Sequence, residues 1–144
     1  MANLVDSGYG RATKLLDDQH RRGSVPGAAS AYNRPMSSVF VVLCTFPNAD
    51  EASNVAKTLV GEELVACINI VPGLRSIYRW QGEIHDASEV LAVIKTTEAG
   101  FPALEQRLAA LHSYDCPEIL ALPVNQGHAP YIDWVLGNVS STTT

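Results

Sequence analysis

Short apolar runs and turn residues alternate along the chain from residue 39 onward. Such runs are typical of strands when they are rich in β-branched residues, and a continuous run is typical of a buried central strand. Pro72 and Gly73 bend or break one run before it resumes, and Gln81–Gly82 is a tight-turn signal. The pattern predicts strands over Val39–Thr45, Val65–Val71, Leu74–Trp80, a polar segment through His85, Val90–Thr96 and Glu118–Val124.

Three further stretches have the apolar spacing of helices, with positions three and four residues apart on one face. In the first, which begins after the capping residue Asp50, the apolar positions are Ala52, Val55, Ala56, Leu59 and Val60. The second has Pro102 in its first turn, where a missing N–H is harmless. Its apolar positions are Phe101, Leu104, Leu108 and Leu111. A short helix over Pro130–Leu136 closes the pattern.

The order of these elements is β-α-β-β-α-β with a terminal helix, which predicts the α+β class. It is the ferredoxin-like arrangement, in which two helices pack on one face of an antiparallel sheet. The hairpin Val65–Thr96 is long for so small a domain, and its far end is expected to project beyond the helices. An apolar ribbon of this kind, with Tyr78 and Trp80 near its tip, needs cover from itself or from another subunit. Oligomerisation is therefore expected.

Residues 1–38 differ from the rest of the chain. Residues 1–36 carry five basic and three acidic side chains, and glycines and prolines punctuate the segment. Arg11–Arg22 is the one stretch that could form a short helix, and Ser24–Ala31 resembles a linker of small residues. We predict a flexible extension or leader over residues 1–38, one domain over residues 39–139 and a disordered tail over residues 140–144.

Composition excludes several classes of protein. The chain of 144 residues is 47% hydrophobic and 17% charged, so it is not a disordered polyelectrolyte. No apolar run reaches the ~18 residues that a membrane span needs. A net charge of −5 argues against nucleic acid as the main partner. The three cysteines are widely spaced, which fits neither a zinc finger nor a disulfide scaffold. Together with the lack of a secretory signal, they favour a reducing, cytoplasmic compartment.

Several segments, in order along residues 39–136, resemble the divalent-cation tolerance (CutA) family. They are Val41–Thr45, Leu64–Leu74, Ser76–Gly82, Ile94–Thr97, Leu111-His112 with Tyr114, Pro117–Ile119 and Tyr131–Trp134. The resemblance implies a ferredoxin-like subunit in a tight homotrimer, with long hairpins that wrap around neighbours. It also implies divalent-cation tolerance, copper binding and an architecture similar to PII signalling proteins, without an established catalytic reaction.

The resemblance also implies a copper site. The family site uses a cysteine in the segment that contains Cys44 and histidines just before the Tyr114 position, where His112 matches one and Leu111 replaces another. Thiolate and imidazole are good copper ligands, so weak Cu²⁺ binding through Cys44 and His112 is expected. The alternative is that Cys44 is simply a small buried apolar residue.

Other residues are candidates for a cleft or an interface. Cys67 shares a strand face with Asn69, so the pair is either packed in the interior or part of the wall of an intersubunit cleft. Lys95 is the sole lysine in an apolar strand and needs a carboxylate or an anion, with Glu118 as the expected carboxylate partner. Large amphipathic aromatic residues are typical of interface cores, so packing in a subunit interface is the first interpretation of these residues. The second interpretation is that they line a ligand cleft. These aromatics are Tyr78, Trp80, Tyr131 and Trp134.

Three functions remain open on the sequence. The first is a trimeric protein that binds divalent cations, chiefly copper. The second is a PII-like sensor that holds a small anionic metabolite in an intersubunit cleft lined by Lys95, Tyr78, Trp80 and His112. The third is a structural trimer. The sequence contains no Ser-His-Asp order, HExxH, P-loop or GxGxxG motif, so neither an enzyme nor an organic cofactor is expected.

Overall fold

The computed structural model describes residues 38–140, and the expected helix over Arg11–Arg22 lies outside this range. The described residues form one four-stranded sheet in the order β2-β3-β1-β4, with antiparallel pairing throughout. The elements are β1 (Val39–Phe46), α3 (Ala49–Gly61), β2 (Cys67–Trp80), β3 (Glu83–Thr97), α4 (Phe101–Leu111), β4 (Leu120–Pro123) and α5 (Ala129–Asn138). This order and pairing confirm the predicted ferredoxin-like fold.

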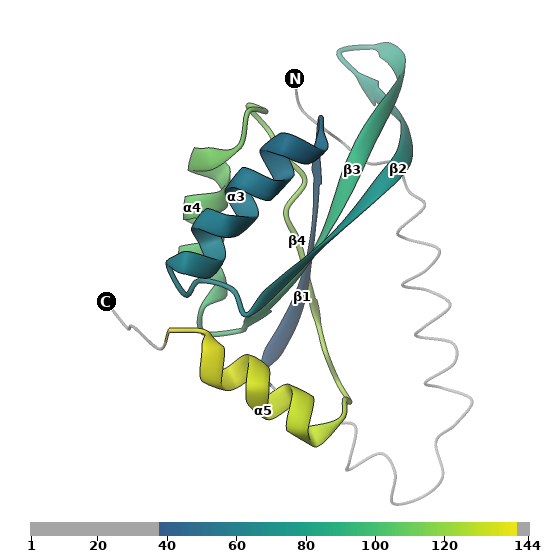
Figure 1. Cartoon of the computed structure of the whole chain (residues 1–144). Helices are drawn as coiled ribbons and strands as arrows, with labels where there is room; N and C mark the ends of the chain where they lie inside the picture. Colours follow the sequence, from purple (N-terminus) through teal and green to yellow (C-terminus); the bar gives the residue numbers. More distant parts are fainter. Residues whose placement is uncertain (1–37, 141–144) are drawn as a thin grey trace, which may run out of the picture.

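Helices α3 and α4 cover one face of the sheet, and α5 lies at the end opposite the hairpin tip (Figure 1). The main core is formed between these two helices and the sheet, and its fully buried members include Val42, Ile94, Leu59 and Leu108. A second, smaller cluster joins Val39 to Ile132 and Val135 of α5. Helices α3 and α4 bury the centre of the predicted apolar stripes, Ala52, Val55 and Leu59 on α3 and Leu104 and Leu108 on α4, whereas Val60 of the predicted α3 stripe is 44% exposed.

The start of α3 differs from the prediction. Asn48, and not Asp50, is the N-cap, because its side chain accepts a hydrogen bond from the backbone N–H of Glu51 at 2.8 Å. Asp50 lies inside the first turn, where a negative charge stabilises the helix dipole. Helix α4 starts as predicted, with a proline in its first turn and no side-chain cap.

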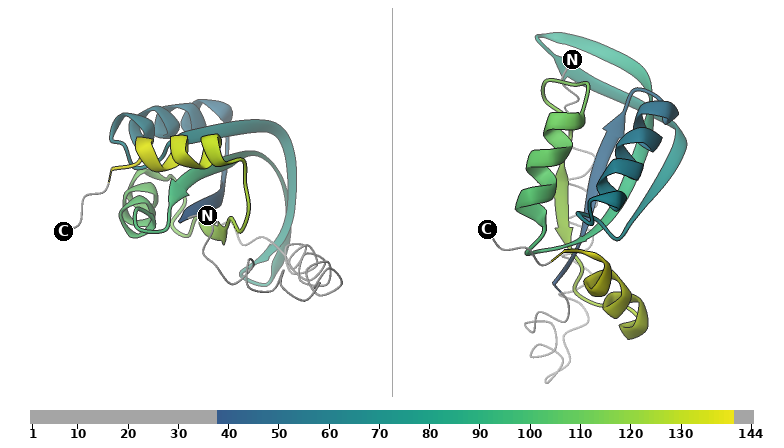
Figure 2. Two further views of the ribbon diagram at one scale, coloured as in Figure 1. Left: turned by 90° about the horizontal axis from the view of Figure 1, so that it is seen from below. Right: turned by 60° about the vertical axis from the view of Figure 1, so that its left-hand side comes forward.

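The hairpin of β2 and β3 is longer and more continuous than the predicted runs. A β-bulge between Val71 and Leu74, with Gly73 at a φ of 82°, bends β2 without ending it. Gln81 and Gly82 form the two-residue turn with positive φ of 51° and 79°. Because β1 pairs with β3 only as far as Phe46 and Val90, residues 74–89 pair only with each other. We call these residues the arm, and together with the rest of β2 and β3 they make a long curved ribbon (Figure 2).

The ends of the last two elements also differ. Strand β4 is shorter than the expected Glu118–Val124, because only Leu120–Pro123 pairs with β1. Helix α5 is longer than the expected Pro130–Leu136 and runs from Ala129 to Asn138. No helix within residues 38–140 has the length and apolar character needed to cross a membrane.

The face of the sheet away from α3 and α4 is apolar. Val42, Cys44 and Phe46 point into the core, so the alternating residues of β1 point to the other side. We call this side the open face. It comprises Val41, Leu43, Leu91, Val93, Leu120 and Leu122. Leu120 and Leu122 are 45% and 42% exposed, although both are large apolar residues.

Candidate functional site

Cys44 lies on the core side of β1 and is fully buried. Its thiol donates a hydrogen bond to the backbone carbonyl oxygen of Thr45, at 3.8 Å, and otherwise lies within the apolar core. Burial, together with the nearby negative charges of Glu118, Glu51 and Glu89, raises the pKa of the Cys44 thiol far above its ordinary value. The thiol is therefore protonated at neutral pH, whereas metal binding requires the thiolate.

His112 caps the C-terminus of α4, and its side chain packs against β1. Its Nε2 lies 2.7 Å from the carbonyl oxygen of Thr45, and its Nδ1 accepts a hydrogen bond from the backbone N–H of Tyr114 at 3.0 Å. A carbonyl can only accept, so Nε2 carries the proton and the ring is neutral. The ring also stacks on Phe46, with centroids 4.5 Å apart. Burial lowers the pKa of His112 and favours this neutral state.

The expected copper ligands are thus close in the fold, because His112 bonds the residue that follows Cys44. Both ring nitrogens already have partners, and a copper ion would have to displace one of them. Among residues 38–140, no three His, Cys, Asp or Glu side chains are grouped so that they could hold a metal ion. Cys44 and His112 alone do not form a closed site, and copper binding stays a prediction.

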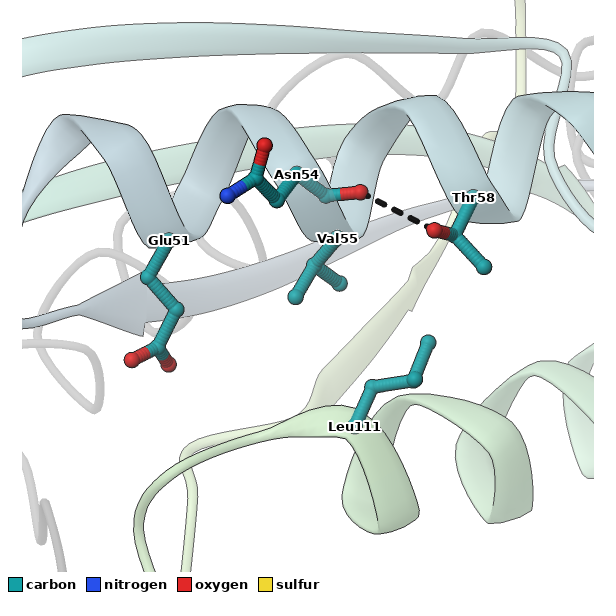
Figure 3. A pocket seen from close by; sticks show the side chains of 5 residues that line it. All are labelled: Glu51, Asn54, Val55, Thr58 and Leu111. Carbon is teal, nitrogen blue, oxygen red and sulfur yellow. Dashed lines mark hydrogen bonds between the residues drawn. The ribbon is translucent and has the colours of Figure 1, made fainter.

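Leu111, which stands where the resemblance implies a second histidine, lines a groove between α3 and α4 (Figure 3). The groove has a volume of about 400 Å³, and its other lining residues are Glu51, Asn54, Val55 and Thr58. Glu51 is engaged at the end of α4, where it accepts hydrogen bonds from the backbone and the hydroxyl of Ser113. The groove gathers none of the predicted site residues.

Lys95 has neutral partners in the structure. It pairs with Cys67 across β2 and β3, donates a hydrogen bond to Asn69 Oδ1, and places its Nζ 3.9 Å from Cys67 Sγ. Tyr131 of α5 adds a hydrogen bond with Cys67, and burial and the Cys67 partner raise the pKa of its hydroxyl. We call Lys95, Cys67, Asn69 and Tyr131 the lysine cluster.

The expected ion pair between Lys95 and Glu118 is wrong. Strand β1 lies between β3 and β4, so the strand that follows Glu118 is not next to Lys95. On β1, Lys95 is level with Val41, whereas Glu118 is two residues beyond the Leu43–Leu120 pair and is level with Thr45. The two side chains therefore lie at different heights on the sheet.

Glu118 lies instead in a buried polar group near the base of the arm. It is 6% exposed, and neither of its carboxyl oxygens has a hydrogen-bond partner among residues 38–140. Burial and the charge of Glu89 raise the pKa of Glu118 to about 7. Glu89 is also buried, and its Oε2 accepts a hydrogen bond from the Tyr114 hydroxyl at 2.8 Å. Thr45 is only 1% exposed, and its hydroxyl group has no hydrogen-bond partner among the described residues either. We call Thr45, Glu89, Tyr114 and Glu118 the carboxyl cluster.

The aromatic candidates lie in two places. Tyr78 and Trp80 are half-buried on the arm, where Tyr78 stacks on His85 with centroids 5.3 Å apart. Tyr131 and Trp134 lie on α5, 5.6 Å apart between ring centroids, and are 43% and 46% exposed. The tip of the arm and α5 lie at opposite ends of the described residues (Figure 1), so a single cleft lined by all four needs more than one copy of the chain.

The fold agrees with the comparison with known proteins. The family described as "CutA1 divalent ion tolerance protein" matches residues 40–138. The chain belongs to this family. The "Divalent-cation tolerance protein CutA" of Thermus thermophilus is 53% identical over 98 residues, which are 68% of this chain and 95% of that protein. The mouse "Protein CutA" is 41% identical over 112 residues, and the chain spans only 63% of its length.

Solved CutA structures have the same fold. CutA1 from Oryza sativa has a TM-score of 0.71 at 36% identity, over 76% of this chain and 100% of that one. A protein from Archaeoglobus fulgidus, described as a periplasmic divalent cation tolerance protein, has a TM-score of 0.68 at 33% identity, over 71% and 99% of the two chains. The names of the Thermus thermophilus and Archaeoglobus fulgidus proteins refer to divalent-cation tolerance and mention no enzymatic reaction.

Proposed function

We propose that this CutA chain is a homotrimer that binds divalent cations, copper among them, and contributes to tolerance of these ions. The observation that carries the proposal is the family match over residues 40–138, together with 53% identity to a divalent-cation tolerance protein. We further propose a cytoplasmic protein without a catalytic role or an organic cofactor.

The apolar surfaces of the single chain support a trimer. The open face exposes Leu120 and Leu122, and the arm exposes Ile77 and Ile84 at 58% and 73%. A soluble monomer rarely leaves such surfaces uncovered, and interfaces of obligate oligomers resemble the core of a domain. A second and a third copy of the chain would cover both surfaces.

Copper binding is proposed at Cys44 and His112. Copper has the highest affinity of the common divalent metals for nitrogen and sulfur ligands, so other divalent ions should bind there more weakly. The site is expected to be weak, because the thiol must lose its proton and a hydrogen bond of His112 must open. Water, a carboxylate or a neighbouring subunit must complete the ligand set.

Isothermal calorimetry on the full chain tests this proposal. Cys44→Ser and His112→Ala should each weaken Cu²⁺ binding by about tenfold or more, because metal sites lose this much even when outer partners of the ligands are removed. Binding should weaken as the pH falls below about 6.5, since the ligand is the neutral imidazole. The lowered pKa of His112 shifts this loss to a lower pH than for an exposed histidine.

Cys116→Ser and His85→Ala are the matched controls, since Cys116 is an exposed free thiol and His85 belongs to the arm. They should leave the copper affinity unchanged. The same affinity in the wild type, Cys44→Ser and His112→Ala would place the metal elsewhere, with His128, His85 and Cys116 as the next ligands to test.

The lysine cluster favours a second function, a PII-like sensor of a small anionic metabolite. Lys95 contacts an amide and a thiol, so its charge is available to an anion in an intersubunit cleft. The aromatic walls, Tyr78 and Trp80, would come from the arm of another copy. The buried ring of His112 makes it the weakest of the four expected lining residues.

Thermal-shift measurements with nucleotides and organic anions test this alternative. A bound anion stabilises the native state and raises the Tm of the wild type. Lys95→Met should abolish the shift, and Lys57→Met, which removes an exposed lysine on α3, should keep it. If no anion raises the Tm, the sensor function is wrong, and the third function, a structural trimer, gains support.

A further inference from the structure

The carboxyl cluster lies at one end of the open face. On β1, Thr45 pairs with Leu91 of β3, and Glu89 is two residues further along the same face of β3. On the other side, Thr45 is level with Glu118, two residues beyond the Leu43–Leu120 pair. Side chains opposite each other on neighbouring strands are about 5 Å apart at Cβ, and diagonal ones about 7–8 Å. Thr45, Glu89 and Glu118 thus point into one small region.

Three oxygen atoms of Glu118 and Thr45 in this region lack donors among the described residues. Both carboxyl oxygens of Glu118 and the hydroxyl oxygen of Thr45 are buried and have no hydrogen-bond partner in the part of the chain that the structure describes. The negative charge of Glu89 acts on Glu118, and Cys44, Tyr114 and His112 are other titratable groups close to the pair. Burial of an unpartnered carboxyl group beside another carboxylate is costly, so the region favours a positively charged occupant.

We propose that Glu118, Glu89 and Thr45 bind one hard divalent cation of the Mg²⁺ or Mn²⁺ class at the base of the arm. Two carboxylates and a hydroxyl group supply oxygen ligands only, and these ligands suit Mg²⁺ and Mn²⁺ rather than copper. Cations of this class are commonly held by one or two carboxylates, with water in the remaining positions. The site therefore needs no third acidic or histidine ligand.

This inference extends the proposed cation binding to a second site with a different preference. The copper ligands Cys44 and His112 supply sulfur and nitrogen, whereas this site contains neither atom. The two proposals can therefore fail separately. A chain that binds Mn²⁺ at Glu118 but no copper would contradict only the copper proposal. A chain that binds copper but no Mn²⁺ would contradict only the proposal of this second site.

The test is a Mn²⁺ titration of the full chain, freed of metal with a chelator, in which electron paramagnetic resonance counts the free ion. We expect one Mn²⁺ per chain in the wild type, with competition from Mg²⁺. Glu118→Gln should weaken Mn²⁺ binding at least about tenfold. Thr45→Val, which removes only the hydroxyl group, should weaken it less. Glu105→Gln, on the exposed side of α4, is the control and should bind as the wild type does.

Three results would overturn the proposal. One is equal Mn²⁺ binding in the wild type and Glu118→Gln. Another is no Mn²⁺ binding to the wild type although the chain is folded by circular dichroism, which would leave a shared proton as the occupant. The third is that the wild type binds no Mn²⁺ and Glu118→Gln no longer forms the oligomer. This result would mean that the Glu118 carboxyl group accepts a hydrogen bond from a second copy of the chain.

Discussion

Replacing Leu122 with glutamate should leave the chain folded but convert the proposed trimer into monomers. Leu122 is 42% exposed on the edge strand β4, so the single chain can solvate a charge there. In a trimer built on the open face, the same charge would be buried against apolar residues without a partner. Burial of an unpaired charge costs several kcal/mol, and a symmetric trimer contains the substitution three times.

Sedimentation velocity at micromolar concentration measures this effect, and far-ultraviolet circular dichroism verifies the fold. Val60→Glu is the matched control, because Val60 is 44% exposed but lies on α3, on the other side of the sheet. It should sediment as the wild type does. A Leu122→Glu protein of trimer mass would show that the β4 end of the open face is not in the interface. A monomeric wild type would contradict the trimer itself.

Glu118→Gln should make the metal-free protein more stable at pH 8 but not at pH 4.5. The folded state raises the pKa of Glu118 from 4.5 to about 7. The folded chain therefore keeps a proton that the unfolded chain has lost. This stabilising contribution is complete below pH 4.5 and is lost as the pH rises to about 7. A shift of this size corresponds to about 3 kcal/mol, and glutamine cannot ionise.

Urea unfolding of the wild type and Glu118→Gln, at equal protein concentration and in a chelator, gives this difference as a function of pH. His112 has the opposite dependence, because its lowered pKa costs stability as the pH falls below 6.5. His112 is present in both proteins, so its effect cancels in the difference. Glu105→Gln should show no pH-dependent difference from the wild type. A constant difference between Glu118→Gln and the wild type would mean that Glu118 titrates normally.

Much of the fold could be predicted from the sequence, because the apolar runs and the helix spacing are local properties. The positions of Pro72, Gly73 and the Gln81–Gly82 turn also predicted the bend and the tip of the hairpin correctly. The error at α3 is small, since Asn48 and Asp50 are both good capping residues and only the backbone conformation decides between them. The extent of β4 depends on its pairing with β1, which no local pattern contains.

The site was less predictable, because it depends on which distant atoms meet. The sequence shows that His112 is present, but not that its two nitrogens bond Thr45 and Tyr114. The expected pairing of Lys95 with Glu118 is wrong because β1 lies between β3 and β4, although β4 follows β3 in the sequence. Glu89 was not predicted, although a lone acidic residue beside the apolar run Val90–Thr96 was the available signal.

The bulge in β2 changes whether odd-numbered or even-numbered residues point to a given face of the hairpin. Before the bulge, odd-numbered residues such as Cys67 and Asn69 share a face with Lys95, whereas after it the even-numbered residues Leu74, Tyr78 and Trp80 do. If all residues of β2 alternated regularly, with no bulge between Val71 and Leu74, Arg75 and Arg79 would occupy that face instead. With this number of residues in β2, the bulge thus decides whether the arm presents aromatic rings or guanidinium groups on the side of the sheet that carries both polar clusters. A deletion of Pro72 or Gly73 would remove the bulge but keep Leu74, Tyr78 and Trp80 on that face, because Val71 and Leu74 would then be two residues apart and could still pair with Leu91 and Glu89.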